Sequence, residues 1–178
     1  MIDPRTLRLW FYRALLVLLI GMITFALMLP LSTLPAAFPG PDLMLVLVFA
    51  WVMRRPEYVP AFLVAALFFL VDMLFQNPPG LRAALVVLGV EFLRQRSGNR
   101  DRPYLVEWAM VVGVMAAILL AERLILSVFL VEQVSFGKQV LRFLMSAAIY
   151  PLVAGISVLV FRVRHIMPGE ADALRSGL

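Results

Sequence analysis

The residues of this chain that could do chemistry are few, and they do not form a catalytic set. His165 is the only histidine, and it follows Arg162 and Arg164 closely. The chain has no cysteine, which removes thiolate nucleophiles, disulfides and thiolate metal sites. It also lacks a glycine-rich phosphate loop and a pair of histidines at metal-binding spacing. We therefore expect no enzyme activity, no catalytic residue, no cofactor and no metal site, and we interpret His165 as a membrane-surface residue.

Charged side chains inside otherwise apolar stretches are the next candidates. Five of them stand out: Asp72, Arg82, Glu91, Glu122 and Arg123. Ionisable groups are costly inside a membrane, so each requires a partner, a functional role or a place at the membrane surface. Asp72 and Arg82 flank a Pro-Pro-Gly turn at similar depth, so we expect a structural ion pair between them. The alternatives for Asp72 are a ligand or ion role and simple exposure at the interface.

Glu91, Glu122 and Arg123 have local explanations. Arg94 follows Glu91 at i+3 on the same helical face, which predicts an ion pair. Glu122 and Arg123 come about 27 Å along the fifth apolar stretch, at ~1.5 Å per residue, and so lie near the outer membrane surface. They are expected to reach headgroups or to pair with a neighbour. Alternatively, they precede a contact segment from Leu124 to Val131, with Leu126 inside it, which extends past the membrane edge.

Small residues at four-residue spacing mark a further surface. Gly113, Ala117 and Ala121 form such a ladder in the fifth apolar stretch. Small side chains let helix backbones approach closely in a membrane. We interpret the ladder as a helix-packing surface, used either within this chain or with another protein.

Long apolar stretches must position all of these residues. The chain is 63% apolar and 15% charged, whereas an average soluble domain is about half apolar and a quarter charged. Lipid accepts such a surplus of apolar side chains. We predict an all-α, polytopic integral membrane protein with a single domain, residues 1–178, and six transmembrane helices. The predicted spans are about 10–34, 42–53, 59–75, 81–93, 104–131 and 143–161, followed by a short mobile tail, 168–178. Spans 42–53 and 81–93 are short, so they could be tilted or could fail to cross fully.

Basic residues indicate the orientation of these spans. With the N-terminus inside, twelve of the 16 Lys and Arg residues fall on the cytoplasmic side and three on the outer side. The outer ones are Arg82, Lys138 and Arg142. This bias predicts cytoplasmic N- and C-termini in an inner membrane. It also explains the positive net charge without a nucleic-acid partner.

The stretch from Pro41 to Leu93 resembles the family of the rod shape-determining protein MreD. The likeness rests on Pro41-Asp42-Leu43, an apolar span ending in Trp51, then Arg54-Arg55-Pro56, Asp72 and Gly80-Leu81-Arg82. Chain length, six predicted spans and the basic cytoplasmic face extend the similarity in pattern over nearly the whole chain. The positions that match the family motif are Pro41, Asp42, Asp72 and Gly80.

The resemblance implies a non-enzymatic scaffold of the bacterial elongation machinery. Members of the family associate with MreC, a bitopic membrane protein, and through it with MreB filaments and peptidoglycan synthases of lateral wall growth. The family is also similar in fold to the substrate-binding subunits of energy-coupling-factor transporters. The implied partners are therefore an MreC-like protein and membrane lipids, and the implied role is support of cell shape.

A second class of function is a small-molecule-binding membrane subunit of a vitamin transporter. Such a subunit requires polar and aromatic side chains that converge on an outer pocket. The polar residues that the sequence places outside are Ser32, Thr33, Asp42, Asp72, Gln76, Asn77 and Arg82. Because this set is small, the sequence favours the scaffold. It leaves open the stoichiometry, the surface that contacts MreC, and whether a lipid or small ligand occupies a groove.

The orientation can be tested with single cysteines, because the chain has none of its own. We expect a cysteine at Ser97 to be protected from a membrane-impermeant thiol reagent in intact spheroplasts and to react after lysis. A cysteine at Asn77, in the predicted outer turn, is the matched control and should react in both. Reaction of Ser97→Cys in intact spheroplasts would refute the predicted topology.

Overall fold

The computed structural model describes residues 4–29, 39–97, 103–130 and 133–159, and this part of the chain is all-helical. His165, Val131 and the predicted tail lie outside the described residues. The helices are α1 (Pro4–Met28), α2 (Leu43–Arg54), the 3₁₀ turn η1 (Pro56–Tyr58), α3 (Ala61–Leu74), α4 (Leu81–Arg96), α5 (Tyr104–Val128) and α6 (Phe136–Leu159).

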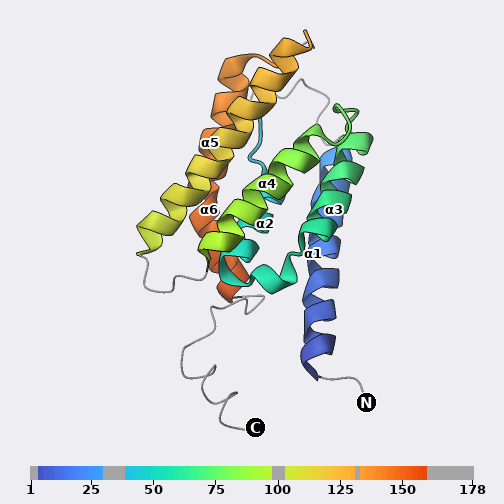
Figure 1. Ribbon diagram of the computed structural model, residues 1–178, viewed down its shortest axis with the longest axis vertical. Coiled ribbons are helices and arrows are strands. Elements are labelled where there is room, and N and C mark those ends of the chain that lie inside the picture. The colour runs from blue at the N-terminus through green and yellow to red at the C-terminus, as the bar shows by residue number, and fades with distance from the viewer. Residues whose placement is uncertain (1–3, 30–38, 98–102, 131–132, 160–178) are drawn as a thin grey trace.

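Successive helices run in alternating directions along the long axis of the molecule (Figure 1). We call the end at which α2, α4 and α6 begin the upper end, and the opposite end the lower end. The start of α1 and the end of α6 both lie at the lower end (Figure 1). The upper end therefore gathers the residues that open α2 and α4, together with those that join α5 to α6.

Helix α2 is the centre of the molecule. Its sequence, LMLVLVFAWVMR, is apolar on all sides, and every residue from Met44 to Arg54 is buried. A helix that is apolar all round belongs in an interior. It packs against α1, α4 and α6, and its largest side chains, Phe49 and Trp51, are fully buried.

The outer helices keep apolar side chains on the molecular surface. Phe62 is 85% exposed, Leu88 66% and Phe25 66%, which suits lipid and not water. Three helices are long and apolar enough to cross a membrane: Thr6–Met28, Tyr104–Val128 and Phe136–Leu159. Helices α2 and α3 are apolar but shorter, about 18 and 21 Å at ~1.5 Å per residue against a hydrocarbon core of about 30 Å.

The largest difference from the predicted boundaries is in α6. This helix begins at Phe136, seven residues before the predicted start at 143. The prediction excluded Lys138 and Arg142 because charge is costly in lipid. The structure accommodates them because both side chains line a polar cavity at the upper end. Two other helices are shorter than predicted at their C-terminal ends: α1 ends at Met28 and α5 at Val128. Leu130, just after α5, has a positive φ of 53°.

Gly89 sets the distance between α4 and its neighbours. A Cβ atom built at Gly89 would lie 2.9 Å from Val114 Cγ1, 3.1 Å from Ile118 Cδ1 and 3.1 Å from Phe49 Cζ. Each of these atoms belongs to a buried side chain. The absence of a side chain at position 89 is therefore what lets α4 pack closely on both α2 and α5.

We expect Gly89→Ala to reduce the free energy of unfolding by about 1–3 kcal/mol, because it overpacks this junction. The melting temperature in detergent should fall accordingly. The matched control is Gly21→Ala in α1, where a Cβ atom would meet nothing within 4 Å and should be neutral or stabilising by up to about 1 kcal/mol. Equal melting temperatures for the two variants would show that the close approach at Gly89 has no energetic importance.

Candidate functional site

The upper end of α2 is built around Asp42. Asp42 is the N-cap of α2, and its Oδ1 accepts a hydrogen bond from the Leu45 backbone N–H at 3.3 Å. An acidic N-cap satisfies an otherwise unpaired N–H and favours the positive end of the helix. The backbone N–H of Asp42 donates to Ser146 Oγ on α6 at 2.7 Å. A capping residue is thus also the contact that fixes α2 against α6.

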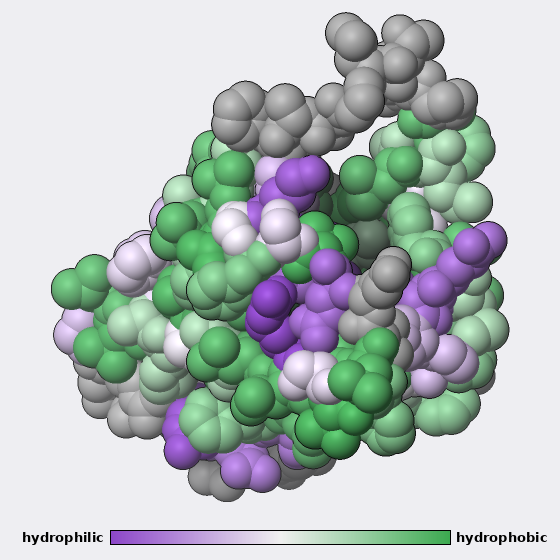
Figure 2. Space-filling view, turned by 90° about the horizontal axis from the view of Figure 1, so that it is seen from above, coloured by the Kyte–Doolittle hydropathy of each residue, from purple (hydrophilic) through white to green (hydrophobic). Residues whose placement is uncertain are grey.

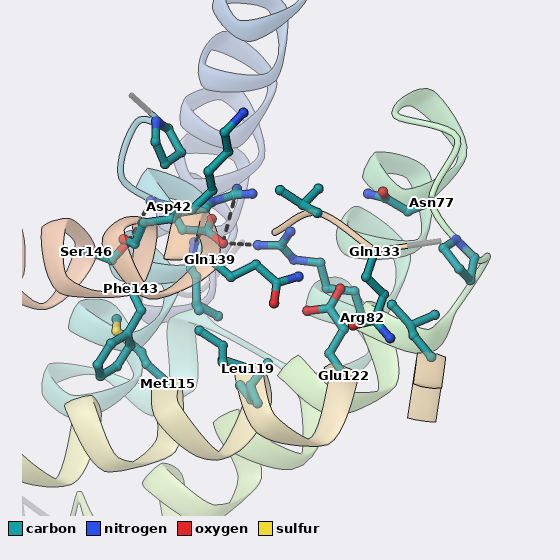
Figure 3. A pocket seen from close by; sticks show the side chains of 18 of the residues that line it. Asp42, Asn77, Arg82, Met115, Leu119, Glu122, Gln133, Gln139, Phe143 and Ser146 are labelled. Carbon is teal, nitrogen blue, oxygen red and sulfur yellow. Dashed lines mark hydrogen bonds and ion pairs between the residues drawn. The ribbon is translucent and has the colours of Figure 1, made fainter. Parts of the chain in front are cut away.

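Two arginines share the other oxygen of the same carboxylate. Arg82, in the first turn of α4, forms an ion pair with Asp42 Oδ2. Arg142 of α6 lies 3.5 Å from the same oxygen. The Asp42 and Arg82 side chains are 9% and 15% exposed, so little solvent screens the pair. Figure 3 shows Arg82 extending across the cavity toward Asp42, so that one carboxylate joins the starts of α2 and α4 to α6.

The predicted Asp72–Arg82 pair is wrong, because Arg82 pairs with Asp42. Asp72 is fully buried, and its Oδ2 accepts a hydrogen bond from the backbone N–H of Ala83 at 3.3 Å. The backbones of Gly80 and Arg82 also face this carboxyl group. The positive N-terminal end of α4 therefore replaces the guanidinium as the partner of Asp72. Gly80 allows this arrangement because its φ of 81° is unfavourable for residues with a side chain.

A cavity of about 500 Å³ lies beside these ion pairs, between α2, α4, α5 and α6. Its charged lining residues are Asp42, Arg82, Glu122, Lys138 and Arg142, and its amide and hydroxyl groups come from Gln76, Asn77, Gln133, Gln139 and Ser146. Apolar side chains, including Met115, Leu119 and Phe143, form another part of the lining (Figure 3). Viewed from above, the upper end has hydrophilic surface gathered near its middle and hydrophobic surface around it (Figure 2).

The two neighbouring charges on α5 do different things. Glu122 lines the cavity together with Arg82 and Arg142. Arg123 donates hydrogen bonds to Gln139 Oε1 at 2.8 Å and to the Val134 carbonyl at 3.3 Å. Arg123 therefore binds the segment that leads into α6. This agrees with one of the two roles expected for it, which was pairing with a neighbouring residue.

A second buried network lies at the lower end and was not predicted. Glu107 Oε1 is 3.4 Å from Arg54 Nη1 and accepts a hydrogen bond from Tyr150 Oη at 2.8 Å. These contacts join α2, α5 and α6, and Trp51 adds a hydrogen bond from Nε1 to Ser157 Oγ at 3.2 Å. From the sequence, Arg54 was interpreted as a cytoplasmic charge and as part of the family resemblance, not as a partner of Glu107. The predicted local pair between Glu91 and Arg94 is confirmed, at 2.8 Å.

The small-residue ladder of α5 lines a different surface feature. Gly113, Ala117 and Ala121 line an apolar groove of about 450 Å³ between α4 and α5, together with Leu88 and Phe92 of α4. A Cβ atom at Gly113 would meet nothing within 4 Å. No described helix of the chain fills this groove.

The predicted contact segment after the ladder divides between two faces. Leu124 is 66% exposed. In contrast, Leu126 lines the polar cavity on the other side of α5. A surface that combines the ladder with Leu126 is therefore not formed, because a helix places these positions on different faces.

Sequence reasoning missed Glu107, Arg142, Ser146 and Tyr150 as site residues. The signal for two of them was present, because Arg142 and Ser146 are separated by four residues and share one face of any helix that includes both. Within the described part of the chain, no group of three or more acidic or histidine side chains could hold a metal ion.

The chain was compared with protein-family models, with curated proteins and with solved structures, and none of these comparisons gives a match. The fold and composition still define a class of protein. The described residues form an all-helical membrane protein with at least three helices long and apolar enough to cross a bilayer.

The importance of the Asp42 cluster can be tested with a double-mutant cycle in detergent. Asp42→Asn should cost about 3 kcal/mol, because Arg82 and Arg142 would face each other without a carboxylate. Arg82→Gln should cost less, since Arg142 still neutralises Asp42. We expect the double variant to be more stable than the sum of the single losses, by about 1 kcal/mol or more.

The matched cycle combines Asp72→Asn with Arg82→Gln. It should be closer to additive, because the Asp72 carboxylate accepts its hydrogen bond from the backbone N–H of Ala83 and not from Arg82. A larger coupling in the Asp72 cycle than in the Asp42 cycle would contradict the pairing seen in the structure.

Proposed function

We propose that this protein is a non-enzymatic membrane scaffold of the bacterial elongation complex that holds an MreC-like, single-span partner. In this proposal all six helices cross the inner membrane, the fold is similar to that of energy-coupling-factor binding subunits, and both termini are cytoplasmic. Through the partner, the protein supports MreB filaments, lateral peptidoglycan synthesis and cell shape.

The observation that carries the proposal is the open groove between α4 and α5. Its lining includes the ladder of Gly113, Ala117 and Ala121, together with Leu88, which is 66% exposed, and Phe92, which is 43% exposed. Lipid gives helices no hydrophobic drive to associate, so close backbone approach must supply the packing. A groove lined by exposed small residues allows a partner helix that approach.

The residues that carry the family resemblance also have defined roles in this fold. Asp42 caps α2 and binds two arginines, Asp72 binds the start of α4, and Gly80 adopts a left-handed conformation. Trp51 and Arg54 connect α2 to α6 and α5. The resemblance therefore rests on positions that shape the helix arrangement, which supports the use of the family as a guide to function.

A small-molecule-binding subunit remains the second candidate, and the polar cavity is the observation that favours it. The sequence argument against it counted few polar residues at the outer end. That count omitted the second half of the chain, from which Glu122, Gln133, Lys138, Gln139, Arg142 and Ser146 also line the cavity. A volume of about 500 Å³ is within the range of small-molecule sites.

The scaffold proposal can be tested at the small residues that line the groove. We expect Ala117→Leu to reduce recovery of a co-expressed MreC-like partner about tenfold, because a bulky side chain blocks close backbone approach. Leu124→Asn, on the exposed face above the ladder, should have a smaller effect in the same direction. Cells that depend on Ala117→Leu should lose their rod shape.

The matched control is Ala66→Leu, an exposed alanine on α3 away from the groove. It should leave partner recovery and membrane abundance unchanged. If Ala117→Leu inserts normally and recovers the partner as well as Ala66→Leu does, the partner does not occupy this groove.

A further inference from the structure

The upper cavity carries an excess of positive charge. Three cationic side chains, Arg82, Lys138 and Arg142, line it against two carboxylates, Asp42 and Glu122. Asp42 pairs with both arginines, but the two carboxylates together leave one of the three positive charges without a counter-charge. An anion is therefore the ligand that the charge of the cavity favours.

Two of the cations are available to a ligand. Lys138 is exposed, and the Arg142 side chain is 41% exposed although it lies 3.5 Å from Asp42. Lys138 and Arg142 are four residues apart and therefore lie on one face of α6, so both can contact one ligand.

The cavity also has an apolar part. The apolar side chains in its lining include Leu45, Met115, Leu119 and Phe143. Glu122, which lies 18 residues after the start of α5, is about 27 Å along that helix, at ~1.5 Å per residue. That distance is close to the thickness of the hydrocarbon core, about 30 Å, so the charged groups lie at headgroup depth if α5 crosses the membrane.

We propose that this cavity binds a phosphate-bearing anion, with the phosphate between Arg142 and Lys138, beside the Asp42–Arg82 pair, and an apolar portion against Leu119 and Phe143. A phosphate group offers more acceptor oxygens than a carboxylate and can contact both of these cations at once. The phosphate could belong to the headgroup of an anionic lipid or to a soluble phosphate ester. This inference goes beyond the scaffold proposal and does not rest on it, because the cavity and the α4–α5 groove share only Ile118 among their lining residues.

The test uses the full-length protein in a maltoside detergent, which carries no phosphate. Thermal unfolding is measured against increasing phosphatidylglycerol, with diacylglycerol of the same acyl chains as the uncharged control. A parallel series uses glycerol 3-phosphate. A ligand that binds only the folded state raises the melting temperature as its concentration increases. We expect stabilisation by at least one of the two phosphate compounds and none by diacylglycerol.

The variants Lys138→Gln and Arg142→Gln should each raise the concentration of phosphate compound needed for half-maximal stabilisation about tenfold, because each removes one charge-assisted contact. Lys138 is exposed, so its replacement keeps the fold even if Arg142→Gln does not. Arg96→Gln, at the opposite end of α4 with its guanidinium over the Phe92 ring, is the matched control and should titrate as the unmodified protein does.

Each outcome decides between the sources or against the site. Stabilisation by phosphatidylglycerol alone supports a lipid headgroup, and stabilisation by glycerol 3-phosphate supports a soluble phosphate ester. The proposal is overturned if neither compound stabilises the protein, if diacylglycerol stabilises it equally, or if Arg96→Gln weakens binding as much as Lys138→Gln. Partner recovery with Ala117→Leu tests the scaffold separately, so one idea can fail without the other.

Discussion

The need to pair charge at the two ends of a fully buried helix organises this structure. Helix α2 contacts protein on every side, and Asp42 and Arg54 at its ends are themselves buried. An uncompensated charge in such a place is strongly unfavourable. Asp42 therefore binds Arg82 and Arg142 at the upper end, and Arg54 binds Glu107 at the lower end. These two clusters join α2 to α4, α5 and α6, and they define where those helices meet.

The polar cavity and the apolar α4–α5 groove are lined by opposite faces of α5. One face carries Gly113, Ala117 and Ala121 and lines an apolar groove with α4, whereas the other carries Met115, Leu119, Glu122 and Leu126 and lines the polar cavity. The same helix can therefore offer a packing surface to a partner helix and a charged lining to a ligand. A ligand in the cavity would contact α2, α4 and α6 as well, so its binding energy would favour the observed arrangement of these helices.

Much of the architecture was accessible from the sequence because lipid imposes simple rules. Apolar stretches of sufficient length predict helices, and the approximate positions of all six described helices follow from them. The start of the last span was predicted wrongly because charged residues were taken to lie outside the span. Lys138 and Arg142 were excluded from the last span, although a cavity and a carboxylate from α2 accept them inside α6. The pairing of Asp72 with Arg82 failed because nearness in sequence does not identify the partner of a charge.

The sequence by itself determined that the chain is helical and rich enough in apolar residues to suit lipid, since composition and periodicity are properties of the chain alone. It determined that Asp42 would open a helix and that Glu91 would meet Arg94, because both are local contacts. Only the tertiary structure decided that Arg82 pairs with Asp42, that the start of α4 binds Asp72, and that Glu107, Arg54 and Tyr150 meet. Those contacts join different helices, and their energy depends on distances that the packing of the helices sets.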